Sequence, residues 1–119
     1  MIRAILFLIW ESLKHSIHMR LKPRVATDEF PAGHGRFGFD PTNPIPCKGF
    51  HGPRRFMEKL KFSDGATLRF ERYGSTGAEN ITVAIIDCYQ VYKNGKEFGD
   101  LYLAPFQKRT SQRLPEGFS

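Results

Sequence analysis

Residues 81–103 read ITVAIIDCYQVYKNGKEFGDLYL, and this stretch decides the fold. Asn94-Gly95 near its centre is the strongest short-range signal for a β-hairpin with a two-residue turn. Such a turn pairs Lys93 with Lys96, Cys88 with Leu101 and Ile86 with Leu103, which gives the hairpin one face that is apolar near its far end. The stretch therefore predicts two long antiparallel strands.

This hairpin register predicts a polar face. It sets Tyr89 across from Asp100 and Asp87 across from Tyr102. Directly opposed residues have Cβ atoms about 5 Å apart, so the four side chains would touch. Two carboxylates framed by two phenol rings suit a cationic partner, or acid–base chemistry if burial raises one pKa. In the simpler alternative, each tyrosine hydroxyl donates to its neighbouring carboxylate and only stabilises the sheet.

A second hairpin is predicted upstream, from Arg55 to Tyr73, with Ser63-Asp64-Gly65 as a three-residue loop. This loop length separates apolar from polar side chains, as a half-buried sheet requires. The predicted core of the two hairpins consists of Phe56, Leu60, Phe62, Leu68, Phe70, Ile86, Cys88, Leu101 and Leu103.

The segment 23–53 is rich in glycine, proline and phenylalanine. Its prolines exclude a continuous helix or a central strand, while its aromatic content is unlike that of a disordered linker. We expect a loop that wraps the sheet and offers Phe37 and Phe39 as binding contacts. The run Gly33–Phe39 also resembles, in composition only, the Arg/Gly/Phe mixtures of single-strand RNA binders.

Residues 1–22 predict an amphipathic helix that ends at Pro23. The apolar run Ala4–Trp10 is far shorter than the roughly 20 residues of a membrane span. We expect this helix to dock on the domain. A translation start at Met19, a signal peptide and an interfacial membrane helix are the alternatives. The expected location is cytoplasmic, with export left open by the signal-like run.

The net charge of +6 is concentrated at the ends of the chain. Residues 1–24 carry +4 and residues 104–119 carry +2, whereas the predicted hairpins are almost neutral. Nucleic acid would therefore be bound by the termini rather than by the sheet. A basic balance that only aids solubility is the alternative.

Catalytic and metal-binding signals are weak. His34, Asp40, Cys47 and His51 share the Gly/Pro loop, but a segment that cannot be helical guarantees no proximity between them. His15 and His18 lie three residues apart on the predicted helix, which supplies too few ligands for a zinc site. Two cysteines are also too few for a disulfide scaffold.

The sequence thus predicts a β-rich α+β fold with an antiparallel meander of about four strands. Its parts are a helix over 1–22, a loop over 23–53, a β domain over 54–106 and an exposed basic tail over 107–119. The expected function is a non-enzymatic binding module that needs no cofactor or metal, with a protein partner or self-association. Nucleic-acid binding by the termini is the first alternative. A small hydrolase-like enzyme using Asp87/Asp100 or Cys47/His51 is the second; a membrane surface is not expected.

Overall fold

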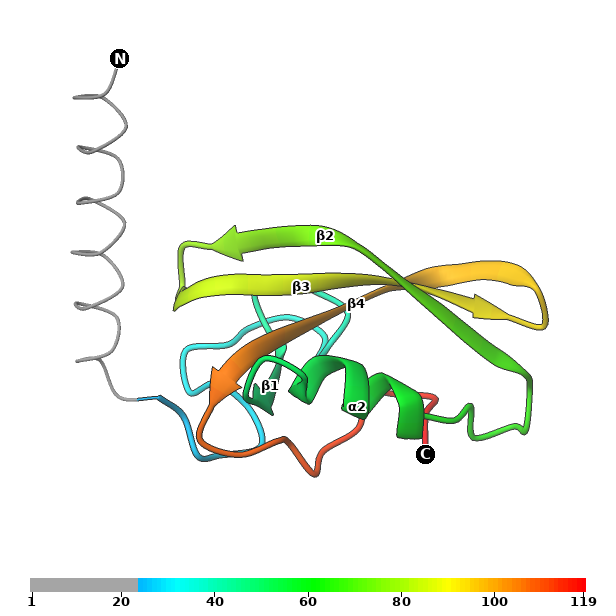
Figure 1. Cartoon of the computed structure of the whole chain (residues 1–119), viewed down its shortest axis with the longest axis horizontal. Coiled ribbons are helices and arrows are strands. Elements are labelled where there is room, and N and C mark those ends of the chain that lie inside the picture. Colours follow the sequence, from blue (N-terminus) through cyan, green and yellow to red (C-terminus); the bar gives the residue numbers. More distant parts are fainter. Residues whose placement is uncertain (1–23) are drawn as a thin grey trace, which may run out of the picture.

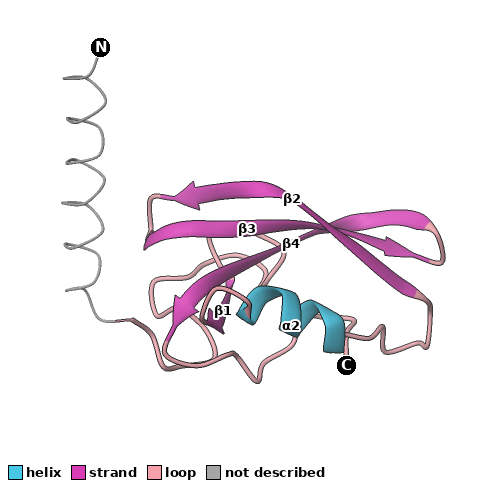
Figure 2. Cartoon of the chain, viewed as in Figure 1, coloured by secondary structure: helices cyan, strands magenta, loops and turns pink. Residues whose placement is uncertain are grey.

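The structure is a computed structural model that describes residues 24–119. This part of the chain forms four strands and one short helix. The elements are β1 (Ile45–Lys48), α2 (Gly52–Lys59), β2 (Leu68–Ala78), β3 (Ile81–Lys93) and β4 (Lys96–Gln107). The strands form one curled sheet in the order β1-β4-β3-β2, and α2 lies against one face (Figures 1 and 2). The predicted β-rich α+β class is confirmed. The sheet is mixed rather than a pure antiparallel meander, because β1 runs parallel to β4. The helix predicted over 1–22 lies outside the described residues.

The hairpin around Asn94-Gly95 is confirmed. Both turn residues adopt positive φ, 51° and 80°, as a two-residue hairpin turn of this kind requires. Lys93 pairs with Lys96, as predicted, and Tyr92 pairs with Glu97.

The register changes one pair farther along, where β4 carries an extra residue. Val91 pairs with Gly99 instead of Phe98, so every later partner is displaced by one position. Phe98 is the extra residue, and its ring lies on the core side, 5.1 Å from the ring of Phe62. Because side chains alternate between faces, this one-residue shift changes which side chains share a face.

The hairpin predicted from Arg55 to Tyr73 is wrong, because its first half is the helix α2. Pro53 stands in the first helical turn, where a missing N–H costs nothing. Phe56 and Leu60 are four residues apart, so both reach the same helical face and are buried. Glu58 interrupts the apolar alternation that a strand would need. β2 instead pairs with β3.

The main core lies between α2 and the sheet. Its buried residues are Phe37, Ile45, Cys47, Phe56, Met57, Leu60, Phe62, Tyr89, Val91, Leu101, Leu103 and Phe118. Leu68 and Phe70, which the sequence placed in the core, are only partly buried at its margin. We call this covered side of the sheet the α2 face.

The opposite side, the outer face, carries a smaller apolar cluster of Phe30, Ile81, Ile86 and Ala104. The expected wrapping loop is therefore correct for Phe30 and Phe37, which are both buried. It is wrong for Phe50, whose side chain is 71% exposed. The loop also contains β1, a short edge strand in which a proline is tolerated.

The tail over 107–119, predicted to be exposed, is exposed only in part. Phe118 is buried in the main core and forms an isolated bridge with Phe62. Ser119 and Lys61 exchange two backbone hydrogen bonds of 2.7 and 3.0 Å. The tail is therefore fixed along its length, and it forms part of the site described next.

Candidate functional site

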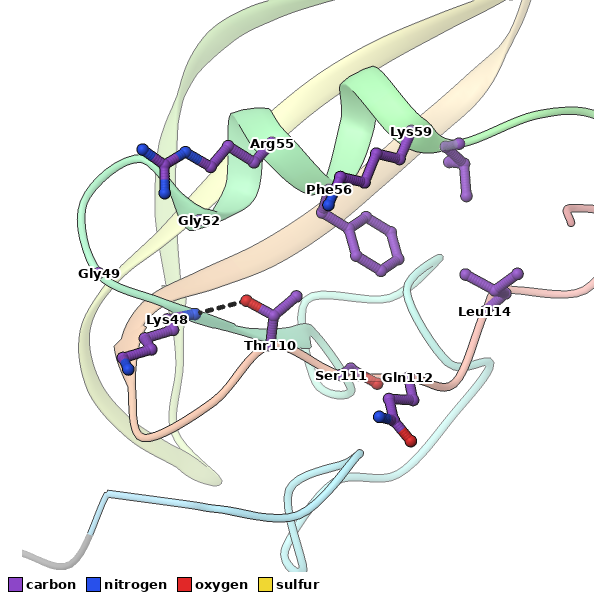
Figure 3. A pocket seen from close by; sticks show the side chains of 11 residues that line it. Lys48, Gly49, Gly52, Arg55, Phe56, Lys59, Thr110, Ser111, Gln112 and Leu114 are labelled. Atoms are coloured by element: carbon purple, nitrogen blue, oxygen red, sulfur yellow. Dashed lines mark hydrogen bonds between the residues drawn. The ribbon is translucent and has the colours of Figure 1, made fainter.

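A groove with a volume of about 770 Å³ lies between α2 and residues 110–114 (Figure 3). Its lining comprises Lys48, Gly49, Gly52, Arg55, Phe56, Lys59, Leu60, Thr110, Ser111, Gln112 and Leu114. Its volume falls within the usual range for ligand sites. We call this feature the basic groove.

One wall of the basic groove is the helix, brought close to β1 by a glycine. A Cβ on Gly52 would lie 3.0 Å from the Cβ of Cys47 and 3.2 Å from its carbonyl carbon. Gly49 adopts a φ of +74° where the chain turns from β1 towards the helix. A side chain at Gly52 would therefore push α2 away from the strand.

The opposite wall is the C-terminal segment, which docks along the free edge of β1. The amide of Lys48 donates to Thr110 Oγ1 at 3.0 Å (Figure 3), and the amide of Ser111 donates to the carbonyl of Pro46 at 2.8 Å. Ser111 Oγ also donates to the carbonyl of Asp28 at 2.6 Å. The C-terminal wall is thus held in place by hydrogen bonds within the protein.

The charge of the basic groove has one sign. Lys48, Arg55 and Lys59 contribute three exposed cations, and no carboxylate is among the described residues of the lining. None of the three forms an ion pair within residues 24–119. The acidic residue of α2, Glu58, is paired with Arg54 at 3.0 Å instead. A cleft lined by cations alone concentrates anions.

Exposed aromatic rings lie beside the loop that lines one end of the groove. The rings of Phe50 and Phe106 are 6.2 Å apart, and the ring of His51 meets that of Phe50 edge-on at 5.0 Å. The amide of Phe106 donates to the carbonyl of Gly49, a lining residue, at 3.3 Å. Phe106 has a φ of 66°, a left-handed conformation that is costly for a bulky residue.

The predicted face of Asp87, Tyr89, Asp100 and Tyr102 is wrong as a geometric unit. The extra residue at Phe98 places Tyr89 opposite Leu101 and Asp87 opposite Leu103, on the α2 face. Tyr89 is buried, and burial raises the pKa of its hydroxyl. The carboxylate of Asp87 is also buried, and it accepts a 3.2 Å hydrogen bond from Arg72. Both residues act here as parts of the core.

Asp100 and Tyr102 lie on the outer face, where Tyr73 joins them. Tyr73 Oη donates to Asp100 Oδ2 at 2.8 Å. Desolvation and the neighbouring carboxylate raise the pKa of both tyrosines. Cys88 lies beneath this group and is almost fully buried. Sequence reasoning missed Tyr73, because it assigned β2 to a different hairpin and could not locate the irregular pairing at this residue.

The phenylalanines predicted as contacts pack inward. Phe37 belongs to the main core, with the guanidinium of Arg113 4.6 Å from its ring centre. Phe39 is half-buried, and its ring lies 6.2 Å from that of Phe118 and 4.2 Å from the guanidinium of Arg36. These rings tie the loop to the C-terminal segment.

The structure does not assemble the proposed cysteine–histidine site. Cys47 is fully buried, and burial, followed by the charge of Asp87, raises the pKa of its thiol far above the ordinary value of 9.0. His51 is exposed beside Phe50, and Asp40 Oδ2 accepts from the amide of Arg36 at 2.7 Å. No group of three histidine, cysteine or acidic residues in 24–119 could hold a metal ion. His15 and His18 lie outside the described residues.

Comparisons of the chain with family models, with curated proteins and with solved structures found no match. In the described part of the chain, no helix is long and apolar enough to cross a membrane. The sequence analysis did not predict the basic groove. The one feature of the sequence that indicates it is the four-residue spacing of Arg55 and Lys59, which both lie in α2.

Proposed function

We propose that the protein is a non-enzymatic binding module for single-stranded nucleic acid, which it holds along the basic groove. The observation that carries the proposal is the lining of three cations without a carboxylate. Phosphates of a nucleic-acid backbone are the anions that such a groove suits, since several cations in a row can each neutralise one of them.

The exposed rings favour a single strand over a duplex. Phe50 is 71% exposed and Phe106 is 41% exposed, beside a loop that also lines the groove. Bases of a single strand are free to stack on such rings, whereas paired bases are not. The left-handed backbone at Phe106 supports a functional role for this ring, because strain of this kind is concentrated at functional sites.

The test is fluorescence anisotropy of labelled single- and double-stranded oligonucleotides, measured at several salt concentrations. We expect tighter binding of the single strand, with an affinity that falls as salt rises. Removing one cation with Lys59→Ala should reduce the slope of log affinity against log salt by about 0.7. Phe50→Ala should weaken binding by roughly tenfold through the loss of one stacked base.

Lys96→Ala is the matched control, because it removes the same charge from the hairpin turn, away from the groove. Equal effects of Lys59→Ala and Lys96→Ala would mean that only net charge matters, and would contradict a site in the groove. Absence of binding at low salt would exclude the proposed ligand.

A protein partner on the outer face is the second candidate function, and Asp100 is the specific observation that favours it. Its carboxylate forms no ion pair with any described residue, accepts a hydrogen bond from Tyr73 and lies close enough to Tyr102 to raise the pKa of that hydroxyl. A lysine or arginine side chain of a partner would gain both an ion pair and cation–π contact there. Titration with a lysine-rich peptide should shift the NMR signals of Tyr73 and Tyr102, and the shift should disappear in Asp100→Asn. Unchanged signals would exclude this candidate.

A further inference from the structure

β2 forms one edge of the sheet and has a partner on one side only. It lies at the edge of the sheet and pairs with β3 (Figure 1). No backbone hydrogen bond from another described residue reaches its outer side. The strand has eleven residues and contains no proline, which would block a further strand. An edge of this kind can bind another strand.

The pairing with β3 shows which backbone groups point outward. The amide of Asn94 donates to the carbonyl of Thr67 at 2.9 Å, so Thr67 faces β3. In an antiparallel pair, alternate residues direct their N–H and C=O groups to the same neighbour. Leu68, Phe70 and Arg72 therefore present their backbone groups to the open side. The register irregularity after Arg72 ends this regular segment.

The side chains of the same segment have a simple pattern. Phe70 lies on the α2 face, half-buried at the margin of the core, with its ring 5.8 Å from that of Tyr89. Arg69 and Glu71 flank it on the outer face, with Arg69 Nη1 2.7 Å from Glu71 Oε1. Phe70 is thus flanked in the sequence by a positive charge at Arg69 and a negative charge at Glu71.

We propose that two copies of this chain associate by antiparallel pairing of their β2 strands, with Phe70 on the twofold axis. In this register Arg69 lies opposite Glu71 of the second copy, and Glu71 lies opposite Arg69 of the second copy. Two ion pairs form across the strands, in addition to the pair within each copy. Opposite charges across an antiparallel pair are favourable.

The charges also exclude the neighbouring registers. Only residues with outward backbone groups, such as Leu68, Phe70 and Arg72, can pair across the interface. The two nearest alternative registers therefore place the twofold axis at Arg69 or at Glu71. An axis at Arg69 sets two arginines opposite each other, and an axis at Glu71 sets two glutamates opposite each other, which is unfavourable. The segment is therefore complementary to itself in one register, which argues for a second copy rather than an unrelated strand.

The apolar side of the segment agrees with this register. Phe70 of each copy would meet Phe70 of the other across the axis, and the partly exposed edge of each core would be covered. The two sheets would join into one continuous sheet. The basic groove lies between α2 and residues 110–114, away from β2, so the association does not depend on the function of the groove.

Sedimentation velocity of the full chain, from low to high micromolar concentration, tests the proposal. We expect a reversible monomer–dimer equilibrium in the wild type. Glu71→Arg should weaken dimerisation by roughly tenfold or more, because it sets like charges opposite each other twice. Arg69→Glu should do the same. The double variant Arg69→Glu/Glu71→Arg should restore the dimer, and an equimolar mixture of the two single variants should form a heterodimer.

Glu79→Arg is the matched control, since it makes the same change of net charge at the turn beyond β2 and should leave the dimer intact. A wild-type protein that stays monomeric at every concentration would overturn the proposal. A dimer that survives both single charge reversals would place the interface elsewhere and would overturn it too.

Discussion

The two faces of the sheet are built largely from the same hairpin, yet they are unlike. On the α2 face, Val91, Leu101 and Leu103 are completely buried beneath the helix and the C-terminal segment. On the outer face, the apolar cluster is confined to one end, and Tyr73 and Asp100 remain accessible farther along. One face therefore holds most of the buried apolar side chains, while the other keeps polar groups accessible.

The difference originates at a single extra residue in β4. Without the irregularity at Phe98, Asp87 and Tyr89 would share a face with Asp100. With it, Asp87 is drawn into the core and needs Arg72 as a partner. A local departure from regular pairing thus decides which carboxylate is structural and which is available.

The largest expected effect comes from truncating the α2 face. Leu101→Ala should lower the free energy of unfolding by about 3 kcal/mol, since it leaves a cavity in a fully buried site. Tyr102→Ala, at the next residue on the outer face, should cost clearly less because that side chain is only partly buried. Denaturant unfolding measures both. Equal losses would show that the faces contribute equally.

The next largest effect separates the two carboxylates. Asp87→Asn should cost about 2 kcal/mol, because it replaces a charge-assisted hydrogen bond to Arg72 with a weaker neutral one and adds an amide donor at a buried site. Asp100→Asn should cost under about 1 kcal/mol, since it alters a bond to an exposed tyrosine. Urea unfolding of both variants decides the matter, and the reverse order would mean that the face assignments are exchanged.

A structural feature could be predicted from the sequence when it depends on neighbouring residues, and could not be predicted when it depends on residues far apart in the chain. The Asn94-Gly95 turn is a local signal, so it fixed the hairpin and its first pairs. The irregularity at Phe98 depends on contact with Phe62 and Phe118, which are distant in sequence, and no local pattern reveals it. The predicted polar face failed for that reason.

The prediction for residues 52–60 was wrong for a different reason, because these residues fit both the two-residue period of a strand and the 3.6-residue period of a helix. Phe56, Leu60 and Phe62 alternate as in a strand, but Phe56 and Leu60 are also one helical turn apart, and Glu58 fits only the helix. With the helix, Arg55 and Lys59 would have been recognised as one basic surface. The second wall of the groove had no signal, since Thr110 and Ser111 are placed by pairing with β1, some sixty residues away.

An alkaline scan compares the cysteines of the two faces. Burial raises the pKa of both thiols, and the rise is largest for Cys47 on the α2 face. Its stabilising effect is fully present below the unfolded-state value of 9.0 and is lost as pH rises towards the folded-state value. The free energy of unfolding should therefore fall above pH 9, by up to about 1.4 kcal/mol per pH unit for such a thiol.

The variant Cys47→Ala should flatten that fall, and Cys88→Ala should flatten it less. Unfolding measured in urea from neutral to alkaline pH provides the comparison. The same slope in wild type and Cys47→Ala would show that other groups, such as the tyrosines, account for the loss.

The smallest expected effect concerns Phe106, at the aromatic end of the basic groove. At a φ of 66°, glycine is unstrained and alanine is not, so Phe106→Gly should be more stable than Phe106→Ala by about 1 kcal/mol. Both variants remove the same ring, so both should weaken oligonucleotide binding equally. Stability and affinity would then respond to different properties of one residue, backbone conformation and ring respectively. If alanine proved as stable as glycine, the left-handed conformation would carry no strain, and its support for a functional ring would be lost.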